Sequence, residues 1–526
     1  MKRALKNALA VCFISILCGS IHLTYTGLCL SKEEQGDRTD KEEQSKPKEA
    51  VKERTSKTSA SMLLDGEEIS YTATAGEIII EKEDDADVKG RLFFVAYELN
   101  DAEKSSRPVT FAFNGGPGAA SIWLHLGGLG PKRVKLKDDG TVLPPPAQYV
   151  DNRFTWLKFT DLVFVDPVGT GFSDSIPHDE KHRKEFFGFK QDIEVVADFI
   201  RLYLSRQQRW ISPIFLVGES YGTTRVSGLT RHLHQRYGID LNGVILISPV
   251  LDYDTILFHP SNDLPYLLFL PTYASIARYH KMLPETLQSK DRSRLLAEVQ
   301  DFCLNTYASC LANGEDLDAK RKRDLAVKIT AYTGLPESLV NLNNSRISWM
   351  DFTKNLLKHE RKLVGRMDGT VRGLDPEPMN PFPRYDPSLD PLYGPFSSAM
   401  NAYVRTDLGF QTDQVYEFLN MKVNRQWDWT SGLTRKQGFI DVSPTLKEAM
   451  VVNDDLQVFI ASGLYDLATP YFAAQYTISH MWLGSRRSNV TIKRYPAGHM
   501  IYTHSESLEK LTQDVRVFYN DILTPG

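Results

Sequence analysis

A short apolar run that leads into a serine between two glycines constrains the fold of this chain more than any other feature. Residues 214–217 are Ile-Phe-Leu-Val, and the chain continues as Gly218-Glu219-Ser220-Tyr221-Gly222. This order predicts a buried strand, a strained turn in which both glycines leave room, and a helix that starts just after the serine. Ser220 is therefore the candidate nucleophile. A bare Gly-x-Ser-x-Gly also occurs in ordinary turns, so the interpretation depends on the rest of the chain.

The composition is that of an ordinary globular protein. Of 526 residues, 42% are hydrophobic and 24% are charged, which is close to the average for folded domains. The formal net charge of −4 gives no reason to expect nucleic acid or an anionic membrane as a partner. The length allows several domains, or one α/β domain with insertions.

The N-terminus has the pattern of a secretory signal. Lys2, Arg3 and Lys6 precede an apolar stretch at residues 8–17, which is short for a bilayer span. We therefore predict a signal region over residues 1–30, and export to the periplasm or the extracellular space. The mature chain should have no stable membrane insertion. An uncleaved membrane anchor is the alternative.

The next segment, residues 31–61, mixes acidic and basic side chains with few apolar ones. Such a segment cannot bury enough surface to offset its ordering entropy, so we predict a flexible linker, with ordered structure from near Met62. Residues 68–73, 77–82 and 90–99 then alternate as β-strands do, which predicts antiparallel strands at a sheet edge.

The middle of the chain alternates between buried strands and helices. Continuous apolar runs lie at residues 109–113, 162–165, 214–217, 244–247 and 456–461, and helical spacing lies at 191–204 and 224–237. This order predicts a mostly parallel sheet with helices on both faces. Residues 251–449 are instead rich in helix formers, aromatic residues and prolines. We interpret them as a large, mainly helical cap inserted into a core formed by residues 62–250 and 450–526.

Two cysteines lie close together in this insertion. In an oxidising compartment Cys303 and Cys310 could form a disulfide, with two free thiols as the alternative. A zinc site would need two more ligands, which we do not find in the sequence. We therefore predict neither a metal nor a cofactor.

Two later residues can complete a catalytic triad with Ser220. Asp466 follows the strand-like run at 457–461, and His499 follows the run at 490–495. In α/β-hydrolases the triad follows the order Ser, acid, His, with both partners on loops after later strands. His499 would take the proton of Ser220 and return it to the leaving group, while Asp466 would hold the imidazole in the productive tautomer. We therefore predict an α/β-hydrolase fold with this triad.

A glycine-rich loop upstream supplies a further element. Asn114-Gly115-Gly116-Pro117-Gly118 follows the predicted strand at 109–113. Glycines let a loop approach the reacting carbonyl with free backbone N–H groups, as an oxyanion hole requires. A tight turn or a phosphate-binding loop is the alternative, although the lysine of a P-loop is absent.

These blocks together resemble the serine carboxypeptidases, which are α/β-hydrolases with a helical cap, and specifically a secreted, bacterial-type member. The resemblance covers roughly residues 65–522. The matching blocks, in order, are Asn114 to Gly118, Asp166-Pro167-Val168-Gly169-Thr170-Gly171-Phe172-Ser173, Gly218 to Gly222, Asp466 with Pro470, and Gly498-His499. The resemblance implies the triad given above, and the backbone N–H groups of Gly116 and Tyr221 as the oxyanion hole. Asp166 is interpreted as a residue that fixes a turn.

The resemblance also implies a site for the free C-terminal carboxylate of a peptide, formed by Asn114, Gly115 and Glu219. An amide donates directly, whereas a carboxyl group donates only when protonated, which favours acidic pH. The chain has Gly128 where the family usually carries a second glutamate. Without a neighbouring acid to share a proton, Glu219 loses one reason to stay protonated.

Two further departures lie near the first block. Ala112 stands where the family usually has a tryptophan, and Ala119 where it has a cysteine.

Three functions follow from the whole pattern. The first is a carboxypeptidase that acts on peptides through an acyl-enzyme. The second is an esterase or acyltransferase with the same triad, which the lost glutamate favours, and the third is a non-catalytic binding protein of the same fold.

Overall fold

A computed structural model of the protein describes residues 52–82, 85–430 and 439–524. The predicted signal region and most of the predicted linker lie outside these residues. Within the described ranges, no helix is both long enough and apolar enough to cross a membrane.

One large sheet organises the chain, and ten strands form it among the described residues. Their order is β1-β2-β3-β7-β4-β9-β10-β13-β14, with β8 paired to β3. The strands are β1 (Thr55–Leu64), β2 (Glu67–Lys82), β3 (Asp85–Leu99), β4 (Val109–Phe113), β7 (Asp161–Val165), β8 (Asp174–Ile176), β9 (Ile214–Glu219), β10 (Gly243–Ile247), β13 (Gln457–Gly463) and β14 (Val490–Tyr495).

The six strands from β7 to β14 in this order run parallel, and β1, β2 and β3 are antiparallel to their neighbours. Each apolar run that predicted a buried strand lies in one of these parallel strands, except that the last run begins at Leu456, one residue before β13. Because parallel strands end at the same edge, the loops after β4, β9, β13 and β14 meet there. This topology, with the serine turn after β9, is the α/β-hydrolase fold, and the predicted fold class is confirmed.

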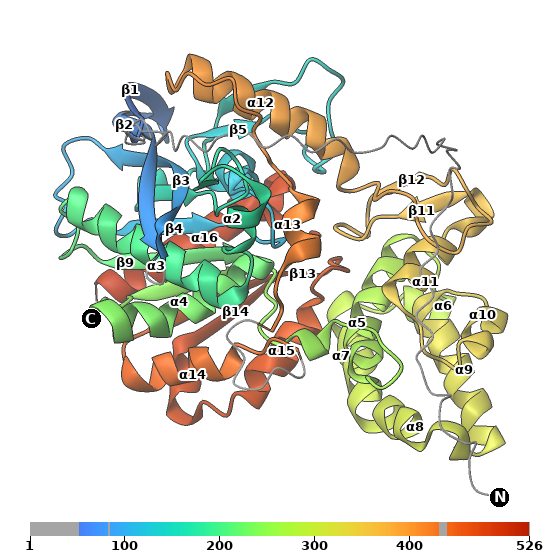
Figure 1. Cartoon of the computed structure of the whole chain (residues 1–526). Helices are drawn as coiled ribbons and strands as arrows, with labels where there is room; N and C mark the ends of the chain where they lie inside the picture. The colour runs from blue at the N-terminus through green and yellow to red at the C-terminus, as the bar shows by residue number, and fades with distance from the viewer. Residues whose placement is uncertain (1–51, 83–84, 431–438, 525–526) are drawn as a thin grey trace, which may run out of the picture. The chain divides into compact units, whose positions relative to one another are not determined.

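Helices cover both faces of the sheet (Figure 1). On one face lie α3 (Phe189–Arg206), α4 (Tyr221–Tyr237) and α14 (Ser443–Val452), and on the other lie α1 (Ile122–Leu124), α12 (Tyr393–Thr406) and α16 (Ser505–Leu523). The sequence of strand β9 reflects this covering of both faces. Ile214 and Leu216 pack on the first face, and Phe215 and Val217 on the second, so the whole strand is apolar. Each such burial contributes about 1.5–3 kcal/mol.

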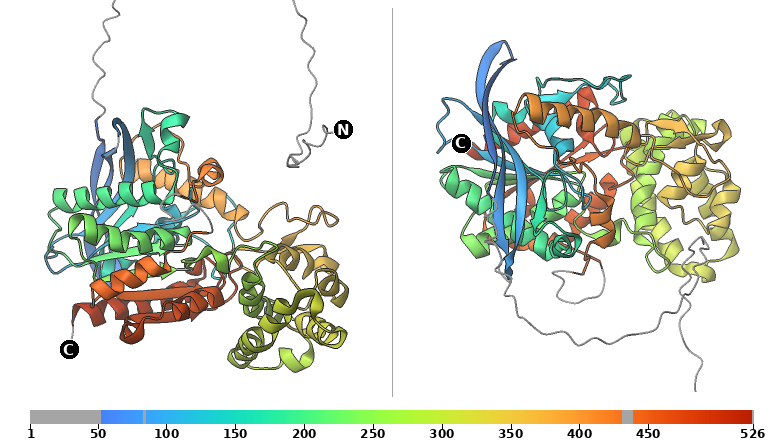
Figure 2. Two further views of the ribbon diagram at one scale, coloured as in Figure 1. Left: turned by 60° about the horizontal axis from the view of Figure 1, so that its bottom comes forward. Right: turned by 45° about the horizontal axis from the view of Figure 1, so that its top comes forward.

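The antiparallel edge differs from the prediction in two ways (Figure 2). Strand β2 continues through Gly76, where a break was predicted, because this glycine makes room for the ring of Phe94 on β3. Strand β1 begins at Thr55, within the predicted linker, and pairs with β2 along its whole length. Its side chains are mostly polar and partly exposed, so the composition did not reveal a strand that backbone pairing stabilises.

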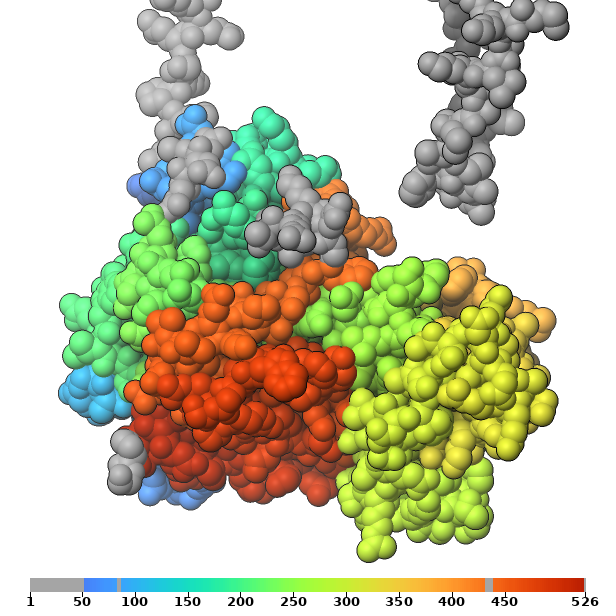
Figure 3. All heavy atoms as spheres, turned by 90° about the horizontal axis from the view of Figure 1, so that it is seen from below, coloured from blue at the N-terminus to red at the C-terminus, as the bar shows by residue number. Residues whose placement is uncertain are grey.

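The insertion after β10 forms a mainly helical body with a core of buried apolar residues (Figure 3). Its elements are α5 (Leu264–Tyr279), α6 (Glu285–Gln288), α7 (Arg292–Phe302), α8 (Ala308–Asn313), α9 (Ala319–Thr333), α10 (Glu337–Leu342), α11 (Trp349–Asn355) and the hairpin of β11 (Lys362–Val364) and β12 (Arg372–Leu374). Leu464 and Leu467, on either side of Asp466, pack into this core. The insertion therefore supports one of the predicted catalytic loops.

The last part of the predicted cap belongs to the sheet instead. Phe396 and Met400 of α12 share a core with β9, and Leu446 and Met450 of α14 share a core with α4. The predicted boundary at residue 449 is therefore too late for the separate helical body. The amphipathic pattern of a helix shows that one face is buried, but it does not show which neighbour buries it.

Cys303 and Cys310 are buried free thiols, so the predicted disulfide is not formed. Cys303 begins the helical segment η4 (Cys303–Tyr307), which continues into α8. At 1.5 Å per residue the two cysteines are about 10 Å apart along the helix, beyond the reach of a disulfide.

We expect Cys303 and Cys310 both to be alkylated in protein that is unfolded without a reducing agent. Reducing agent should leave the melting temperature of the folded protein unchanged, because no bond joins the two thiols. A native disulfide usually contributes about 2–5 kcal/mol to stability. Protection of both thiols from alkylation after unfolding, together with a lower melting temperature in reductant, would contradict the structure.

Candidate active site

Ser220 occupies a strained turn between β9 and α4. Its backbone has φ 59° and ψ −129°, a conformation that costs energy in a residue with a side chain. Close packing explains the two glycines beside it. A Cβ at Gly218 would collide with the carbonyl of Gly222, and one at Gly222 would lie 2.5 Å from the carbonyl oxygen of Phe113. The sequence motif therefore folds as predicted.

The glycine-rich loop after β4 lies directly against this turn. A Cβ at Gly115 would be 2.5 Å from the backbone nitrogen of Tyr221, and Gly116 has φ +100°, which favours glycine. Tyr221 is the first residue of α4, so its N–H has no acceptor within the helix. The glycine-rich loop thus lies beside the N-terminus of α4, where the positive end of the helix dipole favours a developing negative charge.

Asp466 and His499 form a buried pair on the loops after β13 and β14. His499 Nδ1 lies 2.8 Å from Asp466 Oδ2, and both residues are at most 2% exposed. Asp466 also accepts hydrogen bonds from the backbone N–H groups of Ala468 (2.7 Å) and Thr469 (3.0 Å), and from the Thr469 hydroxyl (2.8 Å). Burial lowers the pKa of His499, but the charge of Asp466 and its hydrogen bond more than offset this, and the net pKa is raised.

Ser248, just after β10, connects these loops to the serine turn. Its hydroxyl donates to the backbone oxygen of His499 (2.7 Å), and its own carbonyl accepts from the Thr469 hydroxyl (2.9 Å). One residue earlier, the carbonyl of Ile247 accepts the N–H of Ser220 (3.1 Å). No hydrogen bond between Ser220 Oγ and His499 occurs in the part of the chain that the structure describes. Catalytic contacts of this kind often tighten only when substrate binds.

A segment of the insertion also contacts the histidine loop. The carbonyl of Met367 accepts the N–H of His499 (2.6 Å), and Asp368 fills the space beside Gly498. Asp368 also pairs with His504, at 2.8 Å from Nε2 to Oδ2. The helical body is therefore bonded to the loop that carries the predicted general base.

Glu219 and Asn114 form a second buried polar group beside Ser220. Asn114 Nδ2 donates to Glu219 Oε2, while Asn114 Oδ1 is held by the N–H of Leu124 (2.9 Å). The hydroxyl of Tyr502 also donates to Glu219, at 2.8 Å to Oε2 and 3.0 Å to Oε1. Burial raises the pKa of Glu219 to about 7, although His499, Tyr502 and Asn114 oppose this shift.

A buried ion pair lies behind the turn and fixes it. Arg225 on α4 donates to Asp192 on α3 (2.8 Å) and to the carbonyl of Asn114 (2.7 Å). Asp192 also accepts from the hydroxyl of Tyr221 (3.0 Å). The pair therefore joins the nucleophile helix to the glycine-rich loop.

Asp166 performs the turn-fixing role that its sequence context suggested. Its carboxylate accepts from the N–H of Ser121 and from the hydroxyl of Tyr416, both at 2.8 Å. A Cβ at Gly171 would collide with this carboxylate. The block from Asp166 to Ser173 is thus tied to Ser121, which follows the glycine-rich loop.

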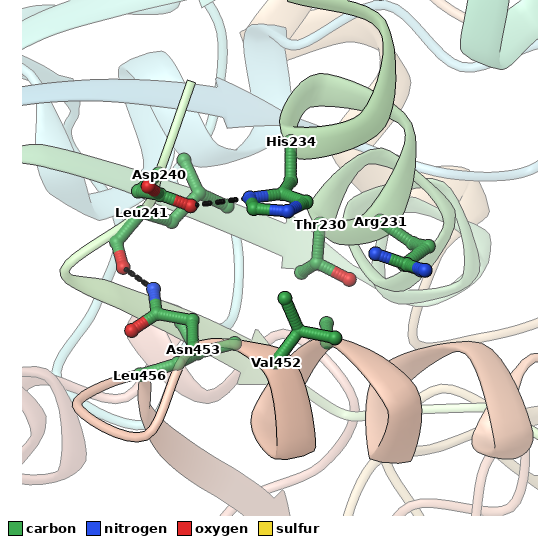
Figure 4. Close-up of a pocket in the computed structure, with 9 residues that line it drawn as sticks. Thr230, Arg231, His234, Asp240, Leu241, Val452, Asn453 and Leu456 are labelled. Carbon is green, nitrogen blue, oxygen red and sulfur yellow. Dashed lines mark hydrogen bonds and ion pairs between the residues drawn. The ribbon is translucent and has the colours of Figure 1, made fainter. Parts of the chain in front are cut away.

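A small pocket between α4 and α14 lies away from this site (Figure 4). Its volume is about 10 Å³, enough for about one water molecule. His234 donates toward Asp240, and Asn453 toward the carbonyl of Leu241. Leu241 precedes β10 and Asn453 precedes β13, so the pocket is at the opposite sheet edge from Ser220.

Within the described residues, no group of three or more His, Cys, Asp or Glu side chains could hold a metal ion.

Several residues that hold the site together could not be predicted from the sequence. Ser248, Tyr502 and Met367 carry no local motif, since each acts through a contact with a distant part of the chain. Thr469 had a weak signal, because it lies three residues after Asp466 in a turn, where a hydroxyl commonly bonds a nearby carboxylate.

Comparison with known proteins identifies a family for this chain. The model of a family described as serine carboxypeptidase matches residues 74–513. The pheromone-processing carboxypeptidase KEX1 of Verticillium alfalfae is 32% identical over 187 residues, which are 33% of this chain and 27% of that protein. Serine carboxypeptidase-like 8 of Arabidopsis thaliana is 27% identical over 191 residues, or 35% of this chain and 41% of that protein. The chain thus matches less than half the length of either relative.

Among solved structures, the proline iminopeptidase of Mycobacterium smegmatis aligns with 85% of this chain and 98% of its own. The sequence identity is 12% and the TM-score is 0.36.

Proposed function

Because the chain belongs to the serine carboxypeptidase family, we propose that it is an exported serine carboxypeptidase that removes C-terminal residues from peptides through an acyl-enzyme. The observation that carries this proposal is the buried pair of Asn114 and Glu219 next to Ser220. A carboxyl group with a pKa of about 7 and an amide are suited to bind the free carboxylate of a peptide.

In the proposed reaction, Ser220 Oγ attacks the carbonyl carbon of the last peptide bond while His499 takes its proton. The N–H groups of Gly116 and Tyr221 stabilise the oxyanion, and His499 then protonates the leaving amine. Water, deprotonated by His499, hydrolyses the acyl-enzyme and restores Ser220. The support for these roles is the contact between His499 and Asp466 and the close approach of the glycine-rich loop to Tyr221.

We propose that the substrate carboxylate binds between Asn114 and Glu219. Nδ2 of Asn114 has two N–H groups. In the structure the amide donates to Glu219 and also hydrogen-bonds Tyr502, so we propose that one of its N–H groups turns to the carboxylate when the substrate binds. When protonated, Glu219 donates as well, whereas its ionised form repels a carboxylate. Gly115 contributes by letting the loop lie against the serine turn.

The proposed location is the periplasm or the extracellular space. It is supported by the basic and then apolar N-terminus of the sequence, which lies outside the described residues. We further propose that the helical insertion shapes the substrate pocket, since its residue Met367 bonds the His499 loop.

We expect a peptide with a free C-terminus to be cleaved with a kcat/KM about 10 to 100 times that of the same peptide with a C-terminal amide. The reason is that the amide loses charge-assisted hydrogen bonds worth about 1.5–3 kcal/mol. Mass spectrometry of the products measures both rates. Asn114→Ala should reduce this preference. Equal cleavage of the two peptides would exclude recognition of the carboxylate, and would favour an esterase or acyltransferase that uses the same triad.

A further inference from the structure

The ring of Tyr502 fills space that glycines leave open. Tyr502 follows the His499 loop in the short helix η9 (Ile501–Thr503) and is fully buried. A Cβ at Gly128 would lie 2.6 Å from the Cβ of Tyr502, and one at Gly127 would collide with its ring. A side chain at either position would therefore displace the tyrosine. The glycines of η1 (His125–Leu129) and Tyr502 form one packing unit.

This packing directs the Tyr502 hydroxyl to both oxygens of Glu219, at 2.8 and 3.0 Å. Together with the amide of Asn114, the phenol holds the carboxyl group from one side. Tyr502 and Glu219 are 283 residues apart, so the contact is a product of the fold.

A phenol differs from a second carboxyl group in what it can do with a proton. Its O–H donates to the carboxylate, but a phenol does not accept the carboxyl proton in the neutral range, and burial raises the pKa of Tyr502 far above its usual range. The Tyr502–Glu219 pair therefore gains or loses a single proton, which belongs to Glu219. When Glu219 is protonated, Tyr502 still donates to its carbonyl oxygen, and the acid O–H is left for a ligand.

We infer that Tyr502 is a positioning residue for Glu219, and that its hydrogen bond sets the pH range over which the site binds a free carboxylate. This inference rests on the proposed function, since it concerns the same site. The Tyr502 side chain takes the space beside Gly128, the position at which the sequence resemblance implies a second acid. The Tyr502 hydroxyl, from the segment after His499, thus supplies a hydrogen-bond donor to Glu219 where the second glutamate is missing.

The other groups that face Glu219 define what else contributes to its titration. Burial has the largest effect and raises the pKa of Glu219, and the charge of Asp466 also raises it. The charge of His499 and the hydrogen bonds from Tyr502 and Asn114 lower this pKa, in decreasing order. Removal of the Tyr502 hydroxyl takes away a donor that stabilises the ionised form. The pKa of Glu219 must then rise, and Glu219 stays protonated to a higher pH.

The test measures binding in a Ser220→Ala background, so that no substrate is consumed and proton transfer to His499 plays no part. Calorimetry compares an N-blocked dipeptide that has a free carboxylate with its C-terminal amide, over about pH 5 to 9. We expect the preference for the free acid to fall as the pH rises through about 7. Adding Tyr502→Phe, which keeps the ring, should move this midpoint upward by about one to two pH units.

Tyr495→Phe is the matched control. Its hydroxyl also donates to a carboxylate, that of Asp514 (3.0 Å), and its ring is also buried. It should leave the midpoint unchanged. Gly128→Ala provides a second variant that moves Tyr502, because the added Cβ displaces the ring, and it should shift the midpoint in the same direction as Tyr502→Phe.

The outcomes separate the inference from the proposed function. A background protein with no preference for the free acid at any pH would contradict the proposed carboxylate site. If the background protein prefers the free acid but the midpoint does not move in Tyr502→Phe, the inference is overturned and the proposed function stays intact. Gly128→Ala gives the same test if Tyr502→Phe does not fold. Glu219→Gln should remove the pH dependence, and a midpoint retained in that variant would also overturn the inference.

Discussion

Replacing Ser220 with alanine is expected to lower kcat on a peptide substrate by a factor of about 10⁴ or more. Alanine keeps the backbone of the turn but removes the only atom that can form the acyl-enzyme. Residual turnover would come from the oxyanion hole and from substrate binding alone. The release of the C-terminal residue, followed by mass spectrometry, measures kcat. Labelling by a fluorophosphonate should be lost in the same variant.

Ser227→Ala is a suitable control for this experiment. Ser227 lies on the same helix, α4, and is fully buried, and its hydroxyl has no hydrogen-bond partner in the described structure. Its removal should leave turnover and labelling close to those of the wild type. A wild-type protein that is not labelled at all would contradict every enzymatic function considered for this chain, and would favour a non-catalytic binding protein.

The serine turn could be predicted because its determinants are local. Gly218 and Gly222 are required by contacts within a few residues of Ser220 and with the neighbouring strand end. The apolar runs were equally informative, since a strand covered by helices on both faces must be apolar throughout. Asp466 and His499 were found from their order after later strands, and the parallel sheet brings those strand ends to one edge.

Contacts between distant segments could not be predicted in the same way. The sequence analysis predicted that Glu219 lacks a partner, because Gly128 stands where a second glutamate was expected. In the fold, Tyr502 occupies that space and donates to the carboxyl group of Glu219. Strand β1 is held by backbone pairing, which leaves no pattern in its polar side chains. The segment of α12 was predicted to belong to the cap, yet its buried residues pack in the core of the sheet.

The support around Asp466 determines what a change at this residue would do. Its Oδ1 accepts two backbone N–H groups, from Ala468 and Thr469, while Oδ2 contacts His499. In Asp466→Asn the amide oxygen is expected to stay on the two backbone donors, because an NH₂ group there would face only donors. The amide nitrogen would then point at His499 and donate to it.

Asp466→Asn should therefore lower kcat by a factor of about 10⁴ with little change in structure. If His499 Nδ1 accepts from the asparagine, its proton moves to Nε2, and the imidazole can no longer take the proton of Ser220. Asp368→Asn is the matched control, since Asp368 contacts His504 at the same distance of 2.8 Å, and it should change kcat by less than about tenfold. Steady-state kinetics on one peptide compares the two variants. Similar losses in both would show that the Asp466 loop acts through stability and not through the tautomer of His499.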